Sequence, residues 1–323
     1  MHETLRRACE FGVIPCAKIT NPEDALPLCK ALQEAGLPLV EVLLRTEKAC
    51  DAINLIATEY PNILVIAGTV KNTTQVDMAV AAGAQVVITP GFNIGVVQYC
   101  LDQRLPIIPG TSAPSDFELA LDHGLDLVKL FPAGQLGGPE YIKAVTAPYP
   151  ELLLVPTGGV SAETLKNYLR LPNVAAAGGT WIIPEKMVSA GNYAEITRLA
   201  AEAVMLALDF TVNIHLGING PDADTALADA TKVGTLFGLP VKNGNSSIFA
   251  GTVLEFLKTP GRGQHGHIAV GTSSIPRALA YLERNGIHAL PGTANPPTGK
   301  IKAIYLDLEV GGFPFHLLQT EGK

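Results

Sequence analysis

The chain lacks an uninterrupted apolar run of the ~20 residues that a membrane-spanning helix requires. Its first residues, Met-His-Glu-Thr-Leu-Arg-Arg, lead into an apolar segment that Pro15 and Lys18 break early, so we expect no signal peptide. Positive charge is also scarce, since the chain has 23 lysines and arginines but 30 acidic residues, and its net charge is -7. This balance argues against nucleic acid or an anionic membrane as a partner, but leaves room for a local phosphate pocket.

Cysteine is sparse and unevenly placed. The five cysteines lie in the first third of the chain without a Cys-x-x-Cys pair, and they are Cys9, Cys16, Cys29, Cys50 and Cys100. Such spacing fits neither a disulfide framework nor a zinc site. We interpret these residues as reduced packing cysteines and expect a cytoplasmic protein.

The 323 residues suffice for two domains, and 47% of them are hydrophobic. As far as about Asp209, short apolar runs alternate with amphipathic segments. The predicted strands are Val13–Ile19, Leu39–Leu44, Ile63–Ala67, Gln85–Thr89, Pro106–Ile108, Leu125–Leu130, Leu152–Pro156 and Val174–Ala177. Eight such units predict an α/β fold, a (β/α)8 TIM barrel over residues 1–208. An open doubly wound sheet is the alternative, but no dinucleotide-binding glycine loop opens the first unit.

The pattern changes near Phe210. The segment Lys242-Asn-Gly-Asn245 is typical of a hairpin turn. A faint repeat is also present, because His215 followed by Ala226-Leu-Ala228 recurs 52 residues later as His267 followed by Ala278-Leu-Ala280. We therefore predict a smaller α+β domain over residues 209–323, built from two paired βαβββ modules.

One charged residue interrupts an otherwise apolar strand. Lys129 lies within Leu125-Asp-Leu-Val-Lys-Leu-Phe-Pro-Ala133. Burying an ammonium group costs several kcal/mol unless the group is paired or loses its proton. A lysine that releases its proton is what Schiff-base chemistry with a carbonyl substrate requires. A structural lysine paired with a carboxylate across the barrel is an equally weighted alternative.

Further polar residues fall at the carboxyl ends of the predicted strands, where active groups of parallel barrels gather. Glu41 and Arg45 alternate onto one face of the second strand, as a buried ion pair or as a base beside a carboxylate-binding cation. The pairs Gly158-Gly159 and Gly178-Gly179 follow the last two strands and precede helices. Exposed N–H groups at such positions bind phosphate, although an ordinary turn has the same composition.

Together these segments resemble the class I 2-keto-3-deoxy-6-phosphogluconate (KDPG) aldolases, many of which also cleave 4-hydroxy-2-oxoglutarate (KHG). The resemblance covers about residues 1–208, with its motifs in order. They are Glu41-Val-Leu-Leu-Arg-Thr46, Ala67-Gly-Thr-Val70, Pro90-Gly91, Lys129-Leu-Phe-Pro-Ala133, Pro156-Thr-Gly-Gly159 and Gly178-Gly-Thr-Trp181.

The resemblance implies a role for each matching residue. Lys129 is implied to be the Schiff-base lysine and Glu41 the general acid/base. The residues implied to hold the pyruvyl end of the substrate are Arg45, Thr69, Pro90, Phe131 and Thr157. Those implied to receive the phosphate are Lys18, Gly158, Gly159, Gly179 and Thr180, the last standing where a serine is common. The family further implies a homotrimer that needs no metal or organic cofactor.

The substrate is left open among related keto acids. KDPG would give pyruvate and glyceraldehyde 3-phosphate, and KHG would give pyruvate and glyoxylate. An aldolase specific for the galactonate epimer of KDPG is one alternative. A phosphate-binding barrel isomerase or epimerase, in which Lys129 is only an electrostatic group, is another. A sugar-binding protein without activity has no reason to bury a glutamate, an arginine and a lysine together.

Residues from about Phe210 onward resemble the glyoxalase/extradiol-dioxygenase fold, also called the vicinal oxygen chelate fold. The resemblance rests on the two-module pattern and on His-Leu-Gly-Ile218, Leu-Glu-Phe-Leu257, His-Ile-Ala-Val270 and Phe-His-Leu-Leu318. It implies metal ligands at His215, Glu255, His267 and His316. A divalent metal bound by this set is one interpretation. A metal-free binding or oligomerisation module is the other.

Overall fold

The computed structural model describes residues 1–320, except for the side chain of Asn213. The chain forms two compact units, of which the first is Met1–Ala207 and the second begins at Leu208. The last three residues of the predicted second domain lie outside the described part. Within residues 1–320, no helix is both long and apolar enough to cross a membrane.

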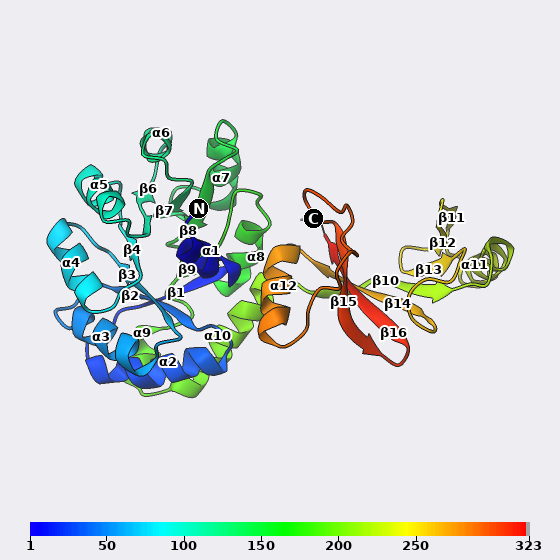
Figure 1. Cartoon of the computed structure of the whole chain (residues 1–323), viewed down its shortest axis with the longest axis horizontal. Helices are drawn as coiled ribbons and strands as arrows, with labels where there is room; N and C mark the ends of the chain where they lie inside the picture. Colours follow the sequence, from blue (N-terminus) through cyan, green and yellow to red (C-terminus); the bar gives the residue numbers. More distant parts are fainter. Residues whose placement is uncertain (321–323) are drawn as a thin grey trace. The chain divides into compact units, whose positions relative to one another are not determined.

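Parallel strands alternate with helices in the first unit (Figure 1). The strands are β1 Val13–Ala17, β2 Leu39–Leu43, β3 Leu64–Gly68, β4 Val86–Ile88, β5 Ile107–Ile108, β6 Gly110–Thr111, β7 Leu127–Leu130, β8 Leu153–Pro156 and β9 Ala177–Gly179. They form one sheet in the order β5-β4-β3-β2-β1-β9 and another in the order β6-β7-β8. Pro109, which has no N–H to give to a ladder, lies between β5 and β6.

Two isolated bridges, Leu154↔Val174 and Thr157↔Gly178, connect the β8 segment to the β9 segment. The first unit is therefore an α/β fold of the TIM-barrel type, with weak strand pairing at two places. The last predicted strand, Val174–Ala177, is displaced, since the ladder of β9 begins only at Ala177 and Val174 forms a single bridge. The prediction was wrong there because the glycines that end β9 have little intrinsic strand propensity.

Helices surround these strands (Figure 1). They are α1 Glu3–Glu10, the 3-10 turn η1 Pro22–Asp24, α2 Ala25–Glu34, α3 Ala49–Glu59, α4 Thr73–Ala81, α5 Ile94–Asp102, α6 Pro114–Asp122, α7 Gly138–Thr146, α8 Ala162–Leu169, α9 Glu185–Ser189 and α10 Tyr193–Leu208. Asn72 and Asn93 cap α4 and α5 by accepting backbone N–H groups with their side chains. Every residue of β1, β2 and β3 is buried, as expected for parallel strands covered on both faces.

As far as residue 320, the second unit is a seven-stranded mixed sheet with two helices. Its elements are β10 Thr211–Asn219, α11 Ala223–Phe237, β11 Val241–Asn243, β12 Ser247–Ala250, β13 Leu254–Leu257, β14 Gly266–Thr272, α12 Ile275–Arg284, β15 Ala303–Val310 and β16 Phe313–Gln319. The strand order is β11-β12-β13-β10-β14-β16-β15. Antiparallel pairing of β10 with β14 sets Leu216 opposite Ile268, so the two repeats meet at residues 52 positions apart.

The two modules differ by one strand. The first runs β10-α11-β11-β12-β13 and fits the predicted βαβββ order, whereas the second runs β14-α12-β15-β16 within the described residues. Residues 285–302 make only the isolated bridges Ala289↔Leu306 and Asn295↔Ala303. The prediction of a matching second module was therefore wrong by one strand. The segment contains Pro296 and Pro297, which have no N–H for a ladder.

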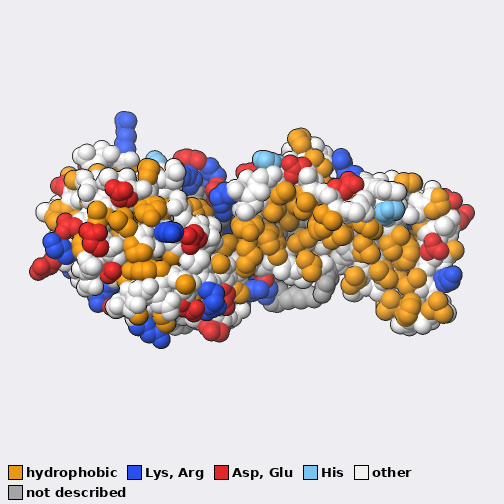
Figure 2. All heavy atoms as spheres, turned by 90° about the horizontal axis from the view of Figure 1, so that it is seen from below, with side chains coloured by type: hydrophobic (Ala, Val, Ile, Leu, Met, Phe, Trp, Pro, Cys, Tyr) orange, Lys and Arg blue, Asp and Glu red, His pale blue; other side chains and the backbone are white. Residues whose placement is uncertain are grey.

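Large apolar side chains are exposed on the second unit, and Figure 2 shows apolar groups spread over the visible face of the molecule. Leu236 and Phe237, at the end of α11, are 69% and 73% exposed, and Val241 of β11 is also exposed. Beneath α11 the packed cluster is small and consists of Ala226, Ala230, Ile248, Ala250 and Phe256. Large exposed apolar side chains that lie close together commonly mark a contact surface, and Leu236 and Phe237 are adjacent in the sequence.

Candidate active site and histidine cluster

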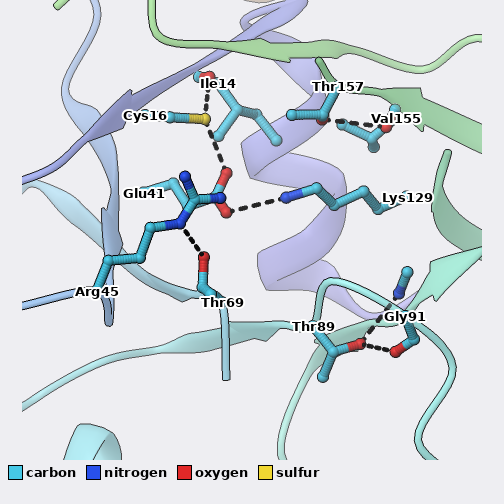
Figure 3. Close-up of polar contacts among 11 residues, drawn as sticks. Ile14, Cys16, Glu41, Arg45, Thr69, Thr89, Gly91, Lys129, Val155 and Thr157 are labelled. Carbon is cyan, nitrogen blue, oxygen red and sulfur yellow. Dashed lines mark hydrogen bonds and ion pairs between the residues drawn. The ribbon is translucent and has the colours of Figure 1, made fainter. Parts of the chain in front are cut away.

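A buried ion pair joins strands on opposite sides of the first unit. Lys129 Nζ of β7 lies 3.3 Å from Glu41 Oε1 of β2 (Figure 3). The two side chains are only 6% and 1% exposed. Burial reduces screening by water, which strengthens the attraction between the charges and fixes the amine beside the carboxylate. Lys129 was interpreted either as a structural partner of a carboxylate or as a reactive amine. The observed ion pair is compatible with both interpretations.

Two neighbours enclose the Glu41 carboxylate. A Cβ atom at residue 68 would overlap Glu41 Oε1, so Gly68 is what leaves room for the carboxylate at the end of β3. On the other side Cys16 Sγ lies 3.0 Å from Glu41 Oε2, because Cys16 and Glu41 are register partners in the β1–β2 ladder. This contact was not predicted from the sequence, since a cysteine in an apolar strand carries no signal beyond packing.

Arg45 lies in the turn after β2, so the prediction that it belongs to the strand was wrong, but it lines the same cavity as Leu43. Its exposed side chain donates from Nε to Thr69 Oγ1 at 3.2 Å (Figure 3). Thr69 has a φ of 61°, a left-handed conformation that β-branched residues rarely adopt. Such strain persists where the surrounding structure fixes the backbone, which is common at functional sites.

One cavity opens where the strands of the first unit end. Its lining residues are Cys16, Leu43, Arg45, Lys129, Phe131, Thr157, Gly158, Gly159, Val160, Gly179 and Thr180. Eight of the predicted site residues are in this set, and Lys129 Nζ lies 5.5 Å from the centroid of the Phe131 ring. Glu41 lies behind Lys129, within contact of its amine. The structure therefore brings most of the predicted catalytic and phosphate residues to one place.

Four predicted residues of the first unit are not among those that line this cavity in the described structure: Glu41, Lys18, Thr69 and Pro90. Lys18 Nζ instead pairs with Glu185 at 3.0 Å, and Thr69 contacts the cavity residue Arg45. The Pro90 loop packs on Gly110, where a Cβ atom would overlap the Pro90 backbone. Their predicted contacts with substrate stay predictions.

The two glycine pairs are required by their surroundings. Gly158 and Gly159 have φ values of 87° and 78°, which favour glycine. A Cβ atom at Gly178 would lie 2.5 Å from Thr157 Oγ1, and one at Gly179 would overlap the Trp181 ring. Both pairs precede helices, α8 and α9, and backbone N–H groups in such turns are suited to bind an anion.

In the second unit the four predicted metal ligands converge. His215 Nε2 lies 3.1 Å from His267 Nε2 and 3.3 Å from His316 Nε2. Glu255 Oε2 lies 3.2 Å from both His215 Nε2 and His267 Nε2. The four side chains come from β10, β14, β16 and β13, and the ligand atoms of the three histidines lie within 4.8 Å of one another.

Burial sets the charge of this cluster. It lowers the pKa of His316 to about 3, with the neighbouring imidazoles adding to the effect, and it also lowers the pKa of His215. Burial alone would raise the pKa of Glu255, but hydrogen bonds from His267 and Ser247 outweigh it and leave that pKa lowered. His215 and His316 are therefore neutral and Glu255 is ionised near pH 7, which are the forms that ligate metals.

Neighbouring groups orient the cluster. Ser247 Oγ donates to Glu255 Oε1 at 2.6 Å, and the Tyr305 ring stacks on His316 with a centroid separation of 5.0 Å. Gly217 leaves space for the His267 ring, which a Cβ atom there would overlap. Outer contacts of this kind typically hold metal ligands in a fixed direction.

Comparison with known proteins identifies the first unit. Residues 3–199, more than half of the chain, match the model of the family described as Aldolase: KDPG and KHG aldolase. The chain belongs to the KDPG and KHG aldolase family. A 2-dehydro-3-deoxy-phosphogluconate aldolase of Haemophilus influenzae is 39% identical over 202 residues, which cover 62% of this chain and 95% of the relative. The predicted membership of the aldolase family is thereby confirmed over residues 3–199.

Two solved structures are similar to the chain. A Legionella pneumophila KDPG aldolase, with pyruvate captured as a covalent carbinolamine intermediate, is 37% identical with a TM-score of 0.59 and covers 61% of this chain and 97% of its own. A Zymomonas mobilis KDPG aldolase with 3-phosphoglycerate is 34% identical with a TM-score of 0.59 and covers 64% of this chain and 97% of its own. The chain is accordingly a class I aldolase, a lyase, and not the isomerase or epimerase of the alternative.

Proposed function

We propose that Lys129 forms a Schiff base with a 2-keto acid and that Glu41 moves the protons of the aldol cleavage. The observation that carries this proposal is the Lys129 amine lining a cavity while it lies 3.3 Å from a buried carboxylate. An amine can attack a carbonyl only after it has released a proton, and Glu41 Oε1 is within reach to accept it. Lysine and base are thus arranged for covalent catalysis without a metal.

The chemistry follows from this pair. Lys129 Nζ attacks the C2 ketone, and loss of water from the carbinolamine gives an iminium ion. Removal of the proton on the C4 hydroxyl by Glu41 then breaks the C3–C4 bond, and the electron pair moves into the iminium. An aldehyde leaves, the enamine takes a proton at C3, and hydrolysis releases pyruvate and restores Lys129.

For the substrate we propose KDPG, with KHG as a second substrate and the galactonate epimer of KDPG as the alternative. The cavity offers Arg45 as a cation for the keto-acid carboxylate and two glycine pairs beside Thr180 for a phosphate. The bound 3-phosphoglycerate of the Zymomonas relative carries the same kind of phosphate. Kinetic constants for pyruvate release from all three substrates test this order, and equal kcat/KM for KDPG and KHG would contradict the phosphate contact.

The phosphate contact predicts a selective effect of Thr180→Val, which keeps the side-chain shape but removes the hydroxyl. We expect KM for KDPG to rise by about 10-fold, because one hydrogen bond to the charged phosphate is lost. KM for KHG should change little. Thr180→Ser is the matched control and should behave like the parent. Equal losses on both substrates would show that Thr180 supports the barrel and not the phosphate. A bulky residue at Gly179 is a poorer probe, because it would collide with Trp181.

For the second unit we propose a divalent metal site made by His215, His267, His316 and Glu255, on the glyoxalase-like fold that the sequence resembles. The fit rests on distance, since nitrogen ligands about 2.0 Å from one ion in a tetrahedron lie about 3.3 Å apart. His215 Nε2 lies 3.1 and 3.3 Å from the Nε2 atoms of His267 and His316, and the ligand atoms of all three histidines lie within 4.8 Å of one another. A bound ion would supply Lewis-acid chemistry, and three imidazoles with one carboxylate suit zinc, nickel, cobalt or iron better than magnesium or calcium.

Metal analysis of protein purified without a histidine tag tests this site. We expect one equivalent of a transition metal, or a rise of about 2.7 kcal/mol in the free energy of unfolding when zinc or nickel is added at 100 times its Kd. His316→Ala should lose that response, whereas His288→Ala, which removes a histidine exposed beside Asp307, should keep it. If the protein neither contains nor binds these metals, the metal site is contradicted. The second unit would then be a metal-free binding or oligomerisation module, an interpretation that the exposed side chains of Leu236 and Phe237 favour.

We further propose a cytoplasmic homotrimer, as the family resemblance implies. A designed cage fused from symmetric oligomeric domains is 27% identical to this chain with a TM-score of 0.55, which is compatible with assembly through the first unit. Light scattering of the purified full chain measures the subunit number directly. A monomer at micromolar concentration would contradict the proposed assembly.

A further inference from the structure

Cys16 is in direct contact with the carboxylate to which we assign the proton transfers. Its Sγ lies 3.0 Å from Glu41 Oε2, while Glu41 Oε1 lies 3.3 Å from Lys129 Nζ (Figure 3). The thiol is 2% exposed and lines the same cavity as Lys129. The two oxygens of Glu41 therefore have different partners, one sulfur and one amine.

The thiol is a permanent donor in this place. Burial raises the pKa of the Cys16 thiol well above its usual range, and the Glu41 carboxylate adds to the rise, whereas Lys129 and the backbone N–H of Gly179 oppose it. The sulfur therefore keeps its proton. Two acceptors are available, Glu41 Oε2 at 3.0 Å and the Ile14 carbonyl at 3.6 Å. The shorter contact with the charged acceptor is the stronger.

We propose that Cys16 is a positioning residue, whose S–H holds Glu41 Oε2 so that Oε1 stays turned toward Lys129 and the reacting substrate. This inference rests on the role in proton transfer proposed above for Glu41. The last torsion of a glutamate side chain is broad, so a carboxylate without fixed partners rotates easily. Proton transfer requires its oxygen within hydrogen-bond reach of the substrate. Cys16 thus acts on turnover, while the substrate carboxylate is bound by other residues.

A matched pair of variants tests the S–H donor. Cys16→Ala removes both the sulfur and the donor, whereas Cys16→Ser restores a donor on a smaller atom. We expect kcat of Cys16→Ala to fall by about 10-fold, because one hydrogen bond to a charged group contributes a factor of this size. KM should stay within about twofold of the parent. Cys16→Ser should recover most of kcat. Cys29→Ala removes a buried thiol of α2 that does not line the cavity and should leave kcat unchanged.

The pH profile gives a readout that packing alone does not change. A donor to a carboxylate favours its ionised form, so the acid limb of kcat should move to higher pH in Cys16→Ala and return in Cys16→Ser. The charged or titratable groups facing Glu41 are Cys16 of β1 and Lys129 of β7, with Arg45 lining the same cavity. Only Cys16 changes between these variants, so the shift reports the thiol.

Two results would overturn the inference: Cys16→Ala with the kcat and pH profile of the parent, or Cys16→Ser as slow as Cys16→Ala. Thermal unfolding of each variant shows whether the fold is intact. Should Cys16→Ala be unstable, Cys16→Val fills the space without a donor and must show the same loss of kcat. Borohydride trapping of pyruvate on Lys129 in the parent protein is a separate experiment, which tests the Schiff base alone. Failure of that trapping would remove the proposed function itself, whereas success with an unaffected Cys16→Ala removes only the role of the thiol.

Discussion

Lys129→Ala is expected to lower kcat by on the order of 10⁴-fold or more, because it removes the nucleophile and with it the covalent route. Lys129 is the lysine that lines the cavity beside a buried carboxylate. Lys143→Ala is the matched control, since Lys143 is a 56% exposed lysine of α7 paired with Glu140. It should keep the activity of the parent. Substantial pyruvate release by Lys129→Ala would place the chemistry on another residue.

The same substitution is expected to destabilise the fold, because it leaves the Glu41 carboxylate buried without its cation. Breaking a buried pair by removing one partner typically costs about 3–5 kcal/mol. Urea unfolding measures this loss. The double variant Lys129→Met with Glu41→Gln removes both charges and should recover much of the stability while remaining inactive. That combination separates loss of chemistry from loss of structure.

Glu41→Gln should slow turnover by about 10²- to 10⁴-fold, the range for removal of a positioned general acid/base. The amide keeps the shape of the side chain and can still accept the S–H of Cys16 through its oxygen. Schiff-base formation with pyruvate should persist, because Lys129 is unchanged. Steady-state kinetics together with adduct mass measure the two effects separately.

Glu185→Gln is the control for this substitution. Glu185 is 63% exposed and pairs with Lys18 at the start of α9. Loss of its charge should change kcat little, since an exposed ion pair contributes only about 0–1 kcal/mol to the stability of the fold. If Glu41→Gln turned over like Glu185→Gln, the base would have to be sought elsewhere in the cavity.

The buried charges were predictable because they break the pattern of their own strands. Lys129 and Glu41 stand in apolar runs, and parallel strands bring their carboxyl ends together, so the sequence alone indicated a shared site. The pairing distance and the role of Cys16 were not accessible. They depend on the register that sets Cys16 opposite Glu41, and no local pattern encodes that register.

The histidine cluster was predictable for a different reason. His215 and His267 occupy equivalent places in a 52-residue repeat, and antiparallel pairing of β10 with β14 brings them together. The second module has one strand fewer than predicted. The prediction was wrong because it gave the second module the same βαβββ order as the first. The end of β2 was missed as well, since strand alternation was continued from Leu43 into the turn that contains Arg45.

Borohydride trapping tests most directly whether Lys129 is the Schiff-base residue. The full chain is incubated with pyruvate and borohydride, digested, and mapped by mass spectrometry. The structure predicts a single reduced pyruvate adduct per chain, on Lys129, whose amine lines the cavity. An adduct on Lys18 or Lys143, or no adduct at all, would contradict the assignment.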